Sequence, residues 1–122
     1  MVVTRHLIKM ETLYTVIGLL ALGALVGMYL LVLVLQNKET PKFVAFIHGA
    51  FVVSGLALLI YYTIAASPGP VEAVVLFIMA ALGGLVLIYK DVTKKPIPKW
   101  LAVGHGLIAV TGFIFLLVFT FS

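Results

Sequence analysis

Four long apolar stretches follow one another along the chain, at about 14–35, 43–66, 71–89 and 100–121. The hydrocarbon core of a bilayer is about 30 Å thick, and a helix of about 20 residues crosses it. Backbone groups in lipid must be paired within their own segment, and none of the four stretches alternates polar and apolar residues as barrel strands do. We therefore predict an all-α, polytopic membrane protein with four transmembrane helices.

Short polar segments join the four stretches, at 36–42, 67–70 and 90–99. The middle segment contains Pro68 and Pro70, which end one helix and precede the next. Such short links force neighbouring helices to run antiparallel, so we expect an up-down-up-down bundle that forms a single membrane domain over residues 1–122.

The second half of the chain resembles the first at a constant offset of 57 residues, without a gap from about residue 16 to residue 63. The matching pairs include Leu19/Leu76, Gly27/Gly84, Lys38/Lys95, Pro41/Pro98, Lys42/Lys99, Ala45/Ala102, His48/His105, Gly49/Gly106, Gly55/Gly112 and Leu59/Leu116. This pattern predicts two tandem two-helix repeats, at about 14–66 and 71–122.

Composition supports the membrane assignment and excludes several classes of function. Hydrophobic residues make up 64% of the chain and charged residues 10%, which is more apolar surface than one small soluble core can bury. The chain has no cysteine, so disulfides, thiolate metal sites and iron–sulfur clusters are excluded. The net charge of +4 comes mostly from lysines between the apolar stretches, a pattern of membrane topology that gives no support to nucleic-acid binding.

The basic residues also predict an orientation. Segments 36–42 and 90–99 carry six lysines, whereas the opposite side carries only Arg5 and Lys9. Basic residues near helix ends favour the cytoplasm, so we expect these two loops inside and both termini outside, in a prokaryotic cytoplasmic membrane. His6 precedes the first span, has no counterpart in the other repeat, and is expected at the interface or in solvent.

The duplicated histidines are the candidate functional residues. Each repeat contains two spans, so both repeats insert with the same orientation, and His48 and His105 should lie at the same depth on opposed helices. Each histidine follows a lysine, Lys42 or Lys99, by six residues, which is about 9 Å along a helix. Ionisable residues inside membrane spans are rare and are functional by default.

A haem b between the second and fourth helices would use this pattern. Two neutral imidazoles, one from each helix, suit the two axial positions of the iron, and the lysines Lys42, Lys99, Lys38 and Lys95 would give its propionates a positive rim. Small residues near the histidines leave room for a flat macrocycle: Ala45, Gly49, Gly55, Ala102, Gly106 and Gly112.

A purely structural interpretation explains the same residues. Pairs of small residues four apart let membrane helices pack closely without a cofactor. Each histidine could then bond a backbone carbonyl, Ser54, Thr111 or the other histidine. A metal ion without porphyrin is the weaker alternative, because no carboxylate or thiolate lies near enough to complete its coordination shell.

The pattern of His-Gly six residues into a helix, repeated two helices later at His48 and His105, resembles small four-helix b-type membrane cytochromes, with the cytochrome b561-like group nearest in kind. That group generally carries two haems and four histidine ligands, whereas this chain offers one intramembrane pair. The resemblance implies one haem b and a role in electron transfer, alone or within a membrane redox complex, with quinol or other redox subunits as partners.

Two other functions stay open. The sequence has no phosphate-binding loop, nucleophile elbow or zinc-protease motif, so we expect no catalysis by the chain itself. A cofactor-free accessory subunit of a larger membrane complex is the first alternative. A small transporter or channel is the second, although its lining would be limited to Ser54, Thr63, Thr111 and Thr120.

Overall fold

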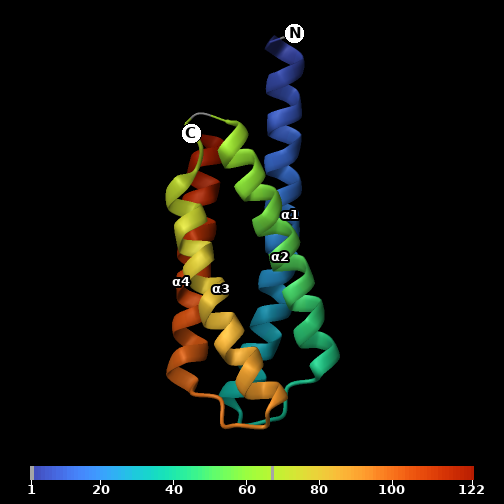
Figure 1. Cartoon of the computed structure of the whole chain (residues 1–122), viewed down its shortest axis with the longest axis vertical. Helices are drawn as coiled ribbons and strands as arrows, with labels where there is room; N and C mark the ends of the chain where they lie inside the picture. The colour runs from blue at the N-terminus through green and yellow to red at the C-terminus, as the bar shows by residue number, and fades with distance from the viewer. Residues whose placement is uncertain (1, 67) are drawn as a thin grey trace.

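A computed structural model describes residues 2–66 and 68–122, with side chains from residue 9 onward. Ser67 and the side chains of Arg5 and His6 lie outside the described residues. The described chain forms four helices that run up and down as a bundle: α1 (Val2–Leu35), α2 (Lys42–Ala65), α3 (Val71–Val92) and α4 (Lys99–Phe121) (Figure 1). All four are long and apolar enough to cross a membrane. The predicted all-α membrane bundle is confirmed.

Helix boundaries differ from the predicted ones at four places. α1 begins at Val2, well before the predicted start at residue 14, and extends past the other helices at the end of the bundle that holds both termini (Figure 1). α3 continues to Val92, so Asp91 lies in its last turn and not in the following loop as predicted. α2 and α4 begin at Lys42 and Lys99, which are therefore the first helical residues and not loop residues.

The two lysine-rich loops leave their helices in the same way. Asn37 and Lys94, which the 57-residue offset relates, both adopt the left-handed conformation, with φ of 58° and 57°. After α1, the amide of Lys38 donates to the carbonyl of Leu33 and the amide of Asn37 to that of Val34. After α3, Lys95 and Lys94 make the corresponding bonds to Lys90 and Asp91. This pair of bonds is the Schellman motif, which satisfies the last carbonyls of a helix.

Each helix packs against its two neighbours in a closed ring, most extensively within the hairpins α1–α2 and α3–α4 and less across α1–α4 and α2–α3. Because the order is a ring, α2 and α4 lie on a diagonal across the bundle axis.

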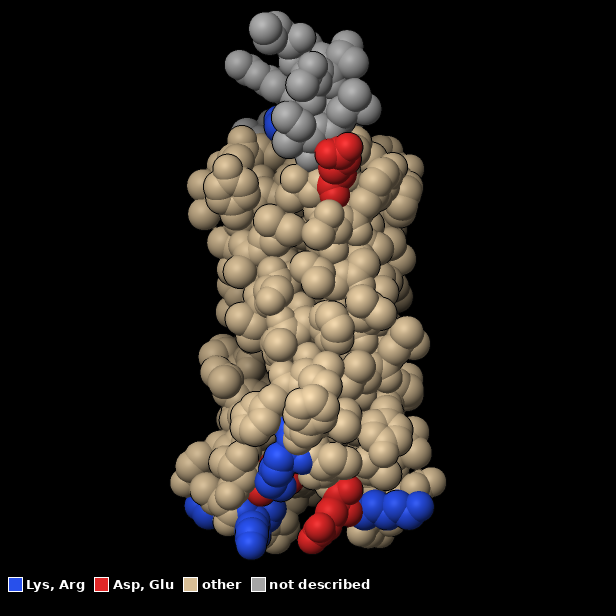
Figure 2. Space-filling model, turned by 90° about the vertical axis from the view of Figure 1, so that its right-hand side faces the viewer, with Lys and Arg blue, Asp and Glu red and all other residues tan. Residues whose placement is uncertain are grey.

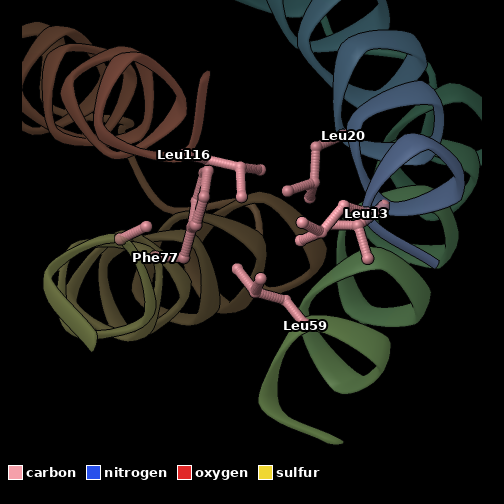
Figure 3. Packing of buried hydrophobic residues seen from close by; sticks show 7 residues of the cluster. Leu13, Leu20, Leu59, Phe77 and Leu116 are labelled. Atoms are coloured by element: carbon pink, nitrogen blue, oxygen red, sulfur yellow. The ribbon is translucent and has the colours of Figure 1, made fainter. Parts of the chain in front are cut away.

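The tightest packing lies in the half of the bundle near the termini. Leu13, Val16, Leu59 and Leu116 are almost completely buried there, and Figure 3 shows leucines from α1, α2 and α4 pointing toward one another and toward Phe77 of α3. Leu59 and Leu116 are again related by the 57-residue offset.

The half of the bundle near the lysine-rich loops, called the loop half below, is packed less tightly. On the loop side of Gly23 in α1 and Ala80 in α3, Ala102 is the only buried apolar residue of the described helices. Small and half-buried side chains line this half, so fewer of its side chains are enclosed than in the half near the termini.

Charge gathers at the loop end of the bundle, and the shaft between the two ends shows no Lys, Arg, Asp or Glu on the face drawn in Figure 2. At this end Lys42 Nζ lies 2.7 Å from Asp91 Oδ1, and the hydroxyl of Thr40 donates to Asp91 Oδ2 at 2.8 Å. Acidic residues are unfavourable at a helix C-terminus, and the two donors offset this for Asp91. The ion pair ties the first hairpin to the second.

Candidate functional site

The structure brings His48 and His105 together in the interior of the bundle. They lie on the diagonal helices α2 and α4, and their ring centroids are 6.2 Å apart with the ring planes at 83°. The predicted placement of the pair, at one depth on opposed helices, is observed.

One nitrogen of each ring bonds the backbone of the neighbouring helix in the same hairpin. His48 Nδ1 lies 2.8 Å from the carbonyl oxygen of Gly23, and His105 Nδ1 lies 2.7 Å from that of Ala80. In both cases the partner is 25 residues earlier in the chain. Of the alternatives considered from the sequence, the carbonyl is thus the partner of Nδ1, and neither Ser54 nor Thr111 bonds either ring.

These bonds decide which nitrogen carries the proton. A carbonyl oxygen can only accept, so Nδ1 of each ring must donate, and in the neutral ring Nε2 is left with a free lone pair. No described residue bonds either Nε2, and no described buried nitrogen lacks a partner, so both Nε2 atoms remain accessible. A ring that donates Nδ1–H to a carbonyl and presents Nε2 is held as metal-ligating histidines usually are.

Two glycines that the site prediction did not include lie against the histidine rings. A Cβ at Gly27 would lie 2.8 Å from Cε1 of His48, and one at Gly84 would lie 3.1 Å from Cε1 of His105. Either side chain would displace a ring. The match of Gly27 and Gly84 at the 57-residue offset is visible in the sequence, whereas their contact with the rings is seen only in the structure.

The small residues predicted to surround the cofactor fall into two groups. Gly55 and Gly112 are used by helix packing, with Leu20 of α1 and Leu76 of α3 close to their missing Cβ atoms. A Cβ at Gly49 would meet nothing within 4 Å, and one at Gly106 would meet only Leu31, at 3.9 Å. Ala102 is buried and Ala45 is half-buried. Neither Gly49 nor Gly106 is therefore in close contact with a neighbouring helix.

Lys42 and Lys99, the two rim lysines that begin α2 and α4, differ in their partners. Lys42 is paired with Asp91, as described above. Lys99 is exposed and has no ion pair or hydrogen bond to any described residue. Of the other two lysines of the predicted rim, Lys95 donates to the hydroxyl of Tyr89 at 3.3 Å and Lys38 is exposed. Lys99 is thus free to meet an anion, whereas Lys42 is not.

Other possible sites among the described residues offer few polar or metal-ligating side chains. Within the described residues, no group of three His, Cys, Asp or Glu side chains could hold a metal ion. A shallow groove of about 350 Å³ on the outside of the first hairpin is lined by Leu19, Ile47, Ala50, Phe51 and Ser54, none of which belongs to the predicted site. The histidine pair is the candidate that combines polar groups with an interior position.

Fold and site define the chain as a multi-pass membrane protein, a four-helix bundle with one interior pair of histidines. No protein-family model, curated protein or solved structure matches the sequence or the fold. The function must therefore be inferred from the histidine pair and its surroundings.

Proposed function

We propose that the protein binds one haem b between its two hairpins, with His48 and His105 as axial ligands, and that it serves in electron transfer within the membrane. The observation that carries the proposal is the matched pair of imidazoles, each bonded through Nδ1 to a carbonyl and each with a free Nε2.

The spacing of the rings suits a shared metal ion. A metal–imidazole bond is about 2.0–2.1 Å long and Nε2 lies about 1.1 Å from the ring centre, so two imidazoles on opposite sides of one metal have centroids about 6.3 Å apart. The observed separation is 6.2 Å. The separation of the ring centroids is thus compatible with one metal ion shared by the two rings.

The surroundings also suit a flat, mostly apolar group. Among the described residues, the loop half of the bundle has no buried side chains apart from Ala102 and Thr40, and the small residues Gly49 and Gly106 directly follow the two histidines. Two donors complete no coordination shell for a bare zinc ion, which prefers four ligands, whereas haem iron takes four from the porphyrin and two from the protein.

The loop end supplies a positive rim for propionates. Lys99 is free and about 9 Å from His105 along α4, the length of six helical residues. Lys42 stands in the same position relative to His48 but is neutralised by Asp91. We expect this end to face the cytoplasm, since it carries most of the basic residues of the chain.

When bound, haem b supplies a reversible one-electron couple. The chain's own residues contribute the ligands, their fixed tautomer and an apolar environment, which together tune such a couple. With one haem, the chain would exchange electrons with quinol or with another redox subunit and would not carry them across the bilayer alone.

A channel finds little support in the polar side chains. The hydroxyls of Thr63, Thr111 and Thr120 each bond the carbonyl four residues earlier in their own helix, so they do not form a path between helices. A cofactor-free accessory subunit remains the alternative that the experiment must exclude.

The test is a reduced-minus-oxidised visible spectrum of the protein purified in detergent from haem-supplied cells. We expect a b-type spectrum in the wild type that is lost in both His48→Ala and His105→Ala. Ser54→Ala and Thr111→Ala are matched controls, because these hydroxyls lie on the same helices without bonding either ring, and they should keep the spectrum. A colourless wild-type protein after haem loading would overturn the proposal, and stable copurification of that colourless protein with other subunits would favour the accessory role.

A further inference from the structure

Each histidine ring lies against a glycine on the neighbouring helix. His48 of α2 lies against Gly27 of α1, where a Cβ would come within 2.8 Å of Cε1 and 3.2 Å of Nδ1. His105 of α4 lies against Gly84 of α3, where a Cβ would come within 3.1 Å of Cε1 and 3.7 Å of Nδ1. Real Cβ atoms are essentially never found within 3.0 Å of a nonbonded heavy atom, so an alanine at Gly27 forces a displacement.

The displaced ring is constrained by its own hydrogen bond. The ring of His48 is tied by Nδ1 to the carbonyl of Gly23, one helical turn before Gly27, so moving away from position 27 lengthens or bends that bond. The same reasoning applies to His105, the carbonyl of Ala80 and position 84. Glycine and carbonyl thus act together on each ring, one as a contact surface and the other as a hydrogen-bond acceptor.

The two rings are fixed independently, because one is held by α1 and the other by α3. Their planes stand at 83° to each other. We infer that Gly27 and Gly84 are positioning residues that fix the rotation of His48 and His105 and so keep the two imidazole planes nearly perpendicular when the pair ligates iron. This inference rests on the proposed haem binding.

Perpendicular imidazole planes have a spectroscopic consequence. Each axial imidazole donates through its π system into the iron orbital perpendicular to its own plane. Two perpendicular rings act on the two orbitals equally and leave them nearly equal in energy, whereas parallel rings split them. The ferric wild type should therefore give a strongly anisotropic low-spin electron paramagnetic resonance signal, and rotation of either ring should change it toward a rhombic one.

The experiment compares the wild type with Gly27→Ala and Gly84→Ala, and with Gly18→Ala and Gly104→Ala as controls. A Cβ at either control position meets nothing within 4 Å, and Gly104 is the direct neighbour of His105. We expect both test variants to retain haem, to shift the ferric signal and to change the midpoint potential, and both controls to match the wild type. If Gly27→Ala gives no folded protein, Gly84→Ala decides, since its added methyl group comes no closer than 3.1 Å to the ring.

A second readout works without haem. Nitrogen NMR of the histidines in the full chain in detergent should show Nδ1-protonated rings in the wild type and loss of that state for His48 in Gly27→Ala. Unchanged spectra in both glycine variants of a haem-binding wild type would overturn the inference and leave the proposed function intact. A wild type that binds no haem would instead sink the proposed function, and the NMR comparison would still report on the rings.

Discussion

Lys42 and Asp91 form an ion pair of 2.7 Å that joins the first turn of α2 to the last turn of α3, and so connects the two hairpins at the loop end. The other oxygen of Asp91 accepts the hydroxyl of Thr40, which is 8% exposed, whereas the Lys42 side chain is 47% exposed. The carboxylate thus serves one exposed and one buried donor.

Removal of Asp91 should therefore cost more than removal of Lys42. Asp91→Ala leaves the buried Thr40 hydroxyl without its acceptor, and we expect the free energy of unfolding to fall by about 1–2 kcal/mol. Lys42→Met removes a side chain that is 47% exposed and leaves Asp91, which is 12% exposed, with the Thr40 hydroxyl as its remaining donor, so we expect a smaller loss of about 1 kcal/mol. Denaturant titration in detergent measures both. Equal losses in the two variants would contradict this assignment, and the double variant Asp91→Ala/Thr40→Val should recover part of the loss because it removes both partners.

Lys94 is a site where the protein can be stabilised. It adopts φ of 57° at the end of α3, a conformation that costs an ordinary side chain about 1–2 kcal/mol and that Asn or Gly adopts more readily. Lys94→Asn should raise the midpoint of thermal unfolding. Asn37 holds the same conformation after α1, so Asn37→Lys is the matched reverse change and should lower the midpoint. A lower midpoint in Lys94→Asn would show that the lysine side chain contributes more than the backbone costs.

The α1–α2 hairpin depends on close approach at Gly23. A Cβ there would lie 2.5 Å from Cγ1 of Val52, so Gly23→Ala must separate the helices or shift the valine, at a cost of about 1–3 kcal/mol. Val52→Ala in the same chain removes the clashing methyl group. The double variant should therefore be more stable than the sum of the single effects predicts, and a double-mutant cycle of unfolding free energies measures this coupling. Additive effects would show that position 23 does not contact Val52.

Much of this arrangement follows from the sequence, for physical reasons that differ from residue to residue. The length and apolarity of the four stretches are enough to predict four helices, because few other backbone structures pair all their hydrogen-bonding groups within a bilayer. The 57-residue offset predicts equal depth for His48 and His105, and the structure places their ring centroids 6.2 Å apart. Nothing in the sequence fixes the rotation of α2 against α1, so the Nδ1 bond to Gly23 and the contact with Gly27 came only from the structure.

The interactions of the charged residues follow less directly from the sequence. The predicted rim treated Lys42 and Lys99 alike, yet Lys42 is paired with Asp91 because α3 runs one turn further than its apolar stretch and brings the carboxylate to the first hairpin. The start of α1 was predicted too late for a related reason. Its first residues are too polar to count as a span, but polarity does not prevent a helix from continuing outside the membrane core.

Orientation can be tested by labelling single cysteines, because the chain has none of its own. A cysteine at Lys38 or Lys95, both exposed in the lysine-rich loops, should be protected from a membrane-impermeant maleimide in intact cells and should react after lysis. A cysteine at Pro68, between α2 and α3, should react in intact cells. The reverse pattern would place the lysine-rich loops outside.

Leu59 of α2 and Leu116 of α4 should contribute most to packing in the half near the termini, since both side chains are 0% exposed. Lipid tails are as apolar as leucine, so truncation in a membrane bundle loses contacts and leaves a cavity without the full transfer cost of a soluble core. We therefore expect Leu59→Ala and Leu116→Ala each to lower the free energy of unfolding by about 1–3 kcal/mol, below the 2–5 kcal/mol common in soluble proteins. Leu107, which is 62% exposed, is the matched control and should lose almost nothing on truncation. Because both buried leucines lie far from the loop half, neither change should alter the histidine NMR signals, and a shift in those signals would show that the two halves of the bundle are coupled.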